Sequence, residues 1–237
     1  MDWIFGLAML LGIGPALILM YLGVRNYTYP KVEQPFFSDP TFFIMLVVGM
    51  IAGSVLFFAM RVLGFSTNIV YMVLMAVIEV MAMVVVMNLK RFRGKSDSIF
   101  YGYALGLGMS CGLATGIVFL VASAIETIDA SAVVLVILSV SFSLMLGAVG
   151  TTVGEGIARH RVMEFALQAA IPAIIFNILL YVAFQDPASF GVLYYVCLAV
   201  MLVVSAYMFY RTMNQRLPQI VREVLKMEGK RRDDIPR

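Results

Sequence analysis

The stretch YGYALGLGMSCGLATG, residues 101–116, decides how this chain folds. It carries five glycines and no charged residue. Gly108, Gly112 and Gly116 recur every four residues, and Gly102 and Gly106 do so one turn earlier. Four-residue steps keep positions on one slowly drifting stripe of a helix. Because apolar burial does not hold helices together in lipid, close backbone packing must, so another helix should lie directly on these glycines.

A second glycine-rich stretch, LGAVGTTVGEG at residues 146–156, offers a matching surface. Gly147, Gly150 and Gly154 are spaced by three and four residues, which again places them on one side of a helix. We therefore expect residues 101–116 to form a central helix whose small-residue face packs closely against another helix.

The composition is that of a membrane protein. Of 237 residues, 62% are hydrophobic and only 13% are charged, and the mean hydropathy is +0.96. A soluble domain is about half apolar and a quarter charged. We therefore expect a multi-pass protein of the cell membrane that is surrounded by the lipid bilayer and has no nucleic acid partner.

Seven apolar stretches are each long enough, at roughly 20 residues, to cross a membrane as a helix. We therefore predict an all-α fold, a polytopic bundle of seven transmembrane helices over residues 1–211 with a basic tail over residues 212–237. The predicted spans are residues 3–23, 41–64, 67–89, 99–122, 131–155, 163–185 and 188–211.

The basic residues between the spans predict the orientation. Segments 24–40, 90–98 and 156–162 and the tail all carry Lys or Arg, and an odd number of spans puts all of them on one side. Cytoplasmic loops hold the excess of Lys and Arg, so the N-terminus should be outside and the C-terminus in the cytoplasm. Arg61 alone breaks the pattern, and its long side chain can extend to the outer surface.

The tail contains the sequence LPQIVREVLKMEGKRR, residues 217–232. Ile220, Val221, Val224 and Leu225 would share one face of a helix. This pattern predicts a short amphipathic helix that lies on the inner membrane surface, helped by the basic cluster at its end. The alternative is a frayed basic tail that only sets the topology.

Two acidic residues near the loop at 156–162 have basic neighbours at helical spacing. Glu155 precedes Arg159 by four residues, and Glu164 follows Arg161 by three. Both spacings bring side chains together on a helix, so we expect two solvated ion pairs at the inner interface.

Five polar or reactive side chains fall within the spans at membrane depth. They are Glu79, Ser110, Cys111, Ser143 and Asn177. Glu79 is the one ionisable acid or base near mid-membrane, where a charge costs several kcal/mol unless it is paired, neutralised or hydrated. We expect Glu79 to face the bundle interior as a neutral acid. It could hold helices together by hydrogen bonding, or it could act as a proton carrier or general base, and the sequence leaves both open.

No cofactor or metal site is expected. The sequence has one histidine, His160, and two cysteines, Cys111 and Cys197, without metal-ligand spacing. Residues 188–211 contain no lysine that could form a Schiff base with retinal.

Two prolines, Pro15 and Pro172, lie inside predicted spans. Each removes a backbone donor, and broken helices line binding sites in transporters. This feature keeps a small proton-coupled transporter, with Glu79 carrying the proton, among the possible functions.

Several segments together resemble a known superfamily. They are YLGVRNYTYPKVEQPFF at 21–37, Glu79 in the third span, SDSIFYGYALGLGM at 96–109, GAVGTTVGEGIARHR at 147–161 and AIIFN at 173–177. Their order is similar to that of PrsW-type membrane proteases, CAAX prenyl proteases and the seven-helix scaffold subunit of gamma-secretase.

The resemblance implies a degenerate active site. The family motif Glu-Glu-x-x-Lys/Arg would align with Glu79-Val80-Met81-Ala82-Met83, so only its first Glu is present. The family's later histidines are missing, whereas Asn177 keeps the Asn of the "FN" position. The scaffold subunit of gamma-secretase shares the seven spans, the orientation and a GxxxGxxxG helix.

These features favour a PrsW-like membrane protein that binds or scaffolds membrane segments of other proteins. Its groove would lie around the third to sixth spans, lined by Glu79, Ser110, Ser143 and Asn177, with Cys111 beside them. The alternative is an active intramembrane peptidase in which Glu79 is the general base and Asn177 holds the oxyanion.

Overall fold

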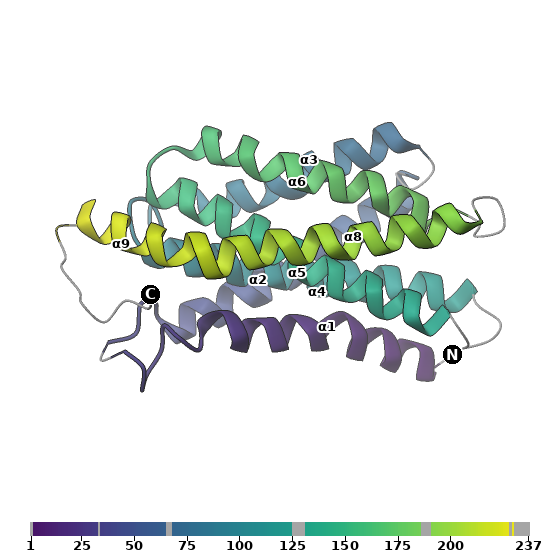
Figure 1. Ribbon diagram of the computed structural model, residues 1–237, viewed down its shortest axis with the longest axis horizontal. Helices are drawn as coiled ribbons and strands as arrows, with labels where there is room; N and C mark the ends of the chain where they lie inside the picture. Colours follow the sequence, from purple (N-terminus) through teal and green to yellow (C-terminus); the bar gives the residue numbers. More distant parts are fainter. Residues whose placement is uncertain are drawn as a thin grey trace.

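The computed structural model describes residues 2–32, 34–64, 68–124, 131–185, 191–227 and 229. These residues form a bundle of long helices that lie roughly parallel to one another (Figure 1). The helices are α1 (Asp2–Val24), α2 (Asp39–Val62), α3 (Ile69–Met87), α4 (Asp97–Ala124), α5 (Ser131–Ala158), α6 (Val162–Ala183), α8 (Val192–Tyr210), the π-helix η2 (Arg211–Arg216) and α9 (Leu217–Met227).

Seven helical segments of the described chain are long and apolar enough to cross a membrane, which confirms the predicted multi-pass architecture. The first six agree with the predicted spans to within three residues at each end. The seventh differs, because its helix does not end near residue 211 but continues to Met227 through η2 and α9.

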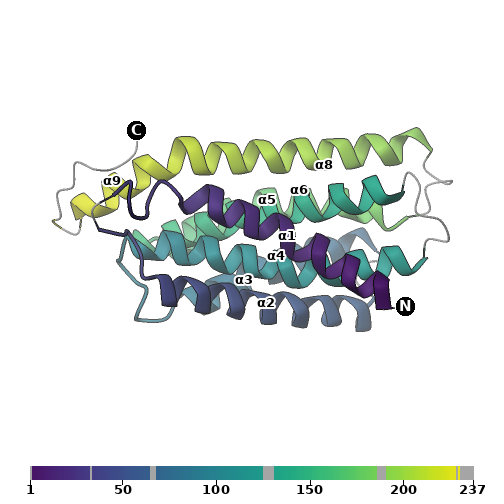
Figure 2. The ribbon, with the colours of Figure 1, turned by 90° about the horizontal axis from the view of Figure 1, so that it is seen from below.

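Helices α4 and α5 form the centre of the bundle. They pack against each other along their length, with α1 and α2 packed on α4 and with α6 and α8 packed on α5 (Figure 1 and Figure 2). Helix α3 lies mainly against α6. The α4 and α5 segments are also the most buried of the seven, so the glycine-rich helix is central, as its sequence predicts.

The glycines of α4 form two stripes rather than one. A Cβ at Gly102 or Gly106 would meet the backbone of Gly150, Gly154 or Leu146 in α5. Six residues separate Gly102 from Gly108, and at 100° per residue this puts the two about 120° apart around the helix. The second stripe therefore faces a different neighbour.

That neighbour is α2. A Cβ at Gly108 would meet the carbonyl oxygen of Leu46, and one at Gly112 would meet the backbone of Met50 and Ser54. Gly116 faces the ring of Phe57. The prediction that α5 matches the glycines of α4 thus holds for Gly102 and Gly106, whereas the GxxxGxxxG run packs on α2.

On α5, the three predicted glycines are not equivalent. Gly150 and Gly154 lie against backbone atoms of α4, where Gly102, Gly106, Ser98 and Ile99 approach them. Gly147 faces side chains of Leu107, Tyr103 and Phe209 instead. Only the first two therefore permit close approach of the two helix backbones.

The prolines do not break their helices. Pro15 lies within α1 and Pro172 within α6, and both helices are continuous through these residues. Among the described helices, a π-helical turn lies instead at η2, where Leu217 N–H donates to the carbonyl of Thr212, five residues earlier. The discontinuous spans that favoured a transporter are therefore not found at either proline.

Helix α9 packs on the protein. Its apolar residues Leu217, Ile220, Val221, Val224 and Leu225 are all buried in the main core. The predicted amphipathic helix is therefore present and the tail is not frayed over these residues, but the apolar face packs on the bundle, whereas we expected it to lie on the membrane. The basic cluster at 230–232 lies outside the described residues.

The basic residues gather at one end of the bundle. The connections from α1 to α2, from α3 to α4 and from α5 to α6 lie at the same end as η2 and α9, on the left in Figure 1. Their Lys and Arg residues are Arg25, Lys31, Lys90, Arg91, Arg93, Lys95, Arg159, Arg161, Arg211, Arg216, Arg222 and Lys226. Arg61 lies at the other end, near the C-terminus of α2. Which end faces the cytoplasm stays a prediction.

Candidate functional site

Glu79 and Asn177 meet inside the bundle. Residues 72, 75, 76, 79, 80 and 83 share the buried face of α3, so helical periodicity turns Glu79 toward α6. Asn177 lies on the buried face of α6, and its Nδ2 donates to Oε2 of Glu79 at 3.2 Å and to the carbonyl of Ala173 at 3.1 Å. Glu79 is 2% exposed and Asn177 is 1% exposed. The pair therefore joins α3 to α6 in a closed environment.

The Oδ1 atom of Asn177 is buried and accepts no hydrogen bond from the described residues. A neutral Glu79 has one O–H to donate, and Oδ1 is the unpaired acceptor on its partner. An acid and an amide facing each other can form two reciprocal hydrogen bonds. A charged Glu79 would leave Oδ1 without a donor, so the site favours the neutral acid.

Ser110 and Ser143 form a second polar contact, between α4 and α5. Their Oγ atoms are 3.4 Å apart, and both residues are fully buried. Ser110 also donates to the carbonyl of Leu107 at 2.6 Å, and Ser143 donates to the carbonyl of Ser139 at 3.2 Å. Within the described chain neither hydroxyl is hydrogen-bonded to Glu79 or Asn177. The arrangement suits helix packing and gives neither serine a base to activate it.

Cys111 points away from this contact. It lies one residue, and so about 100°, further around α4 than Ser110. Its side chain lines a groove of about 480 Å³ between α1, α2 and α4. We call this cavity the α1–α2–α4 groove, and its walls include Phe5, Phe57, Phe58, Thr115 and Phe119. Glu79, Ser110, Ser143 and Asn177 do not line it.

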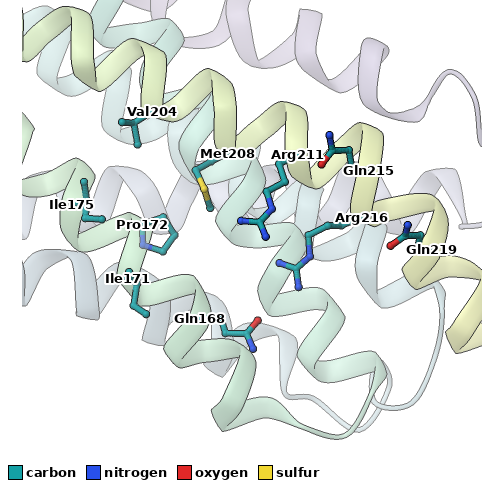
Figure 3. A pocket seen from close by; sticks show the side chains of 10 residues that line it. All are labelled: Gln168, Ile171, Pro172, Ile175, Val204, Met208, Arg211, Gln215, Arg216 and Gln219. Atoms are coloured by element: carbon teal, nitrogen blue, oxygen red, sulfur yellow. The ribbon is translucent and has the colours of Figure 1, made fainter.

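A second cavity, of about 660 Å³, lies between α6 and the helix that runs from α8 through η2 to α9 (Figure 3). We call it the α6–α8 groove. Its lining includes Arg211, Gln215, Arg216 and Gln219 from the C-terminal helix and Gln168 from α6. In the sequence, the arginines of this group serve only as a topology signal. Their spacing gives no sign of a shared site, because five residues of an α-helix would place them on different faces.

The predicted ion pairs are present, one of them in an unexpected setting. Arg161 and Glu164 approach to 3.5 Å with both side chains exposed. Glu155 contacts Arg159 at 2.9 Å but is only 3% exposed, so this pair is not a solvated one. Arg159 also binds Glu223 at 2.7 Å, which links the turn after α5 to α9. Such a buried carboxylate needs its basic partners.

Comparison with known proteins found no protein similar to this chain. No family model, no curated protein and no solved structure matches this chain. Among the described residues no group of three or more His, Cys, Asp and Glu side chains could hold a metal ion. Function must therefore be inferred from the geometry of the chain itself.

Proposed function

We propose that this protein is a PrsW-like membrane scaffold that binds membrane-spanning segments of other proteins without cutting them. The observation that carries the proposal is the enclosure of Glu79. Glu79 is 2% exposed, and its carboxyl accepts a hydrogen bond from the amide of Asn177. A peptidase of this type would need the carboxyl to activate a water molecule beside the scissile bond. Here the same two polar groups fasten α3 to α6.

The α1–α2–α4 groove is the surface that would receive a partner. Its lining is almost wholly apolar and aromatic, with phenylalanine side chains from all three helices. Ser54 and Thr115 add hydroxyls, although that of Ser54 already donates to the carbonyl of Met50. A groove of this kind suits the apolar face of a helix. In the proposed arrangement the basic end of the bundle faces the cytoplasm.

A second candidate, an intramembrane peptidase, has one observation in its favour. The two residues expected to be catalytic, Glu79 and Asn177, come from helices far apart in the sequence and are in contact. The unpaired Oδ1 of Asn177 is also a position where a water molecule could bind. The enclosure of the pair argues against this candidate, since a peptide bond must reach the carboxyl.

The test compares retention with cleavage. The purified protein in lipid is incubated with a library of transmembrane and prenylated peptides, with the Glu79→Gln variant as a matched control, and bound and cut peptides are identified by mass spectrometry. The proposal expects peptides to be retained uncut, equally by both proteins. Fragments made by the native chain and not by Glu79→Gln would contradict the scaffold proposal and support the peptidase.

A further inference from the structure

We propose that the α6–α8 groove binds one anionic phospholipid, with its phosphate at Arg211 and Arg216 and an acyl chain along the apolar part of the groove. This site is separate from the α1–α2–α4 groove and does not depend on the scaffold function. The cavity volume, about 660 Å³, is within the range of about 300–1,000 Å³ that small-molecule sites occupy.

The groove changes chemistry along its length. The half farther from the basic end of the bundle is lined by Ile171, Ile175, Val204 and Met208. The half toward the basic end is lined by arginine and glutamine side chains (Figure 3). A phospholipid has the same division between acyl chain and headgroup. The groove also lies where a headgroup would, because α8 passes from its apolar segment into η2 at this depth.

The π-helix brings the two arginines together. Arg211 and Arg216 are the first and last residues of η2. In an α-helix a five-residue step turns the second side chain about 140° away from the first. Hydrogen bonds between residues five apart instead make such residues neighbours on one face. Figure 3 shows both guanidinium groups on the side that faces α6.

Several polar side chains that line the groove have hydrogen-bond donors that no group of the described chain accepts. Among the described residues, the side chains of Arg211, Gln168, Gln215 and Gln219 make no hydrogen bond or ion pair, and Arg216 forms an ion pair with Glu155 at 3.9 Å. Arg211 is exposed. The guanidinium of Arg211, which has no partner in the described part of the protein, suits a phosphate diester, because arginine binds phosphate with two parallel hydrogen bonds.

The opposite wall, α6, stays a continuous helix but contributes a proline to the groove. Pro172 has no N–H to donate to the carbonyl of Gln168, one turn earlier, and its ring lines the groove. The missing donor at Pro172 and the π-helix η2 therefore lie beside the same cavity. Irregular backbone within a membrane helix is tolerated where it lines a site, and π-helical turns are frequent at functional sites.

The test is a lipid titration of the full chain by native mass spectrometry. The protein in detergent is titrated with phosphatidylglycerol and with phosphatidylcholine of the same acyl chains, and then with glycerol phosphate as a competitor without chains. Arg211→Gln removes a charge from the groove without breaking a protein contact. Arg25→Gln is the matched control, since Arg25 is exposed at the same end of the bundle but outside the groove.

We expect one phosphatidylglycerol to be retained over phosphatidylcholine, with about tenfold weaker retention in Arg211→Gln and no change in Arg25→Gln. Equal retention of the two lipids, or equal loss in both variants, would overturn the site. Displacement of the lipid by glycerol phosphate at equal concentration would overturn the lipid as occupant, because a soluble anion would then suffice.

Discussion

Replacing Gly108 by Ala tests the contact between α2 and α4. The new Cβ would fall on the carbonyl oxygen of Leu46 and lie 2.9 Å from the Cα of Gly49. Both neighbours are backbone atoms, so the whole of α2 must move. Overpacking costs about 1–3 kcal/mol, and we take the upper end because no side chain can rotate away. Alanine recovers about 1 kcal/mol over glycine in a helix, which leaves a net loss of about 2 kcal/mol.

The matched control is Gly14→Ala. Gly14 lies within α1, and an added methyl group there would have no heavy atom within 4 Å, so the change adds no clash. The same gain of about 1 kcal/mol in helix propensity should then leave the protein as stable as before, or more stable.

The assay follows the reaction of a thiol-specific dye with Cys111, which is 1% exposed in the folded protein. Cys197 is replaced by Ser so that it does not contribute. When opening is fast, labelling follows the population of the open form, and about 2 kcal/mol corresponds to roughly thirtyfold faster labelling of Gly108→Ala. Labelling of Gly108→Ala that is no faster than that of the parent would refute the argument.

Two further substitution pairs test the buried polar contacts by thermal unfolding in detergent. Asn177→Leu should lower the free energy of unfolding by about 1–2 kcal/mol, because it leaves the carboxyl of Glu79 without a donor, whereas Glu79→Gln keeps a hydrogen bond to Asn177 and should cost less. Equal effects of these two changes would contradict a structural role for the pair. Arg159→Met should cost about 2 kcal/mol or more because it strips the buried Glu155 of its closest partner, and Arg161→Met, in an exposed pair, should cost under about 1 kcal/mol. A larger loss for Arg161→Met would show that burial does not govern these pairs.

The positions of the helices could be predicted from the sequence, because each span is a long apolar run bounded by polar residues. An apolar stretch does not predict which neighbouring helix each side chain faces. Gly102 and Gly108 belong to different faces of α4, and a count of four-residue repeats did not separate them. Ser110 and Cys111 were expected at one site, yet a single-residue step turns them toward different neighbours.

From the sequence we predicted that Glu79 and Asn177 line the same groove, but not that they are in contact. That they touch follows from the packing of α3 on α6, which no local pattern encodes. The continuation of the seventh helix was missed for a similar reason. Its polar residues end the hydropathy signal near residue 211, but the chain stays helical to Met227, where the apolar face of α9 is buried in the core.

The most direct test of the scaffold proposal is site-specific photo-crosslinking from the α1–α2–α4 groove. A photoreactive amino acid is placed at Phe58, which lines the groove four residues before the end of α2, or at Val196, four residues after the start of α8 at the same end of the bundle. Both side chains are exposed, at 65% and 48%. With a retained transmembrane peptide, the account predicts a crosslink at Phe58 that excess unlabelled peptide removes, and only background at Val196. Equal crosslinking at both positions, or none at Phe58, would contradict it.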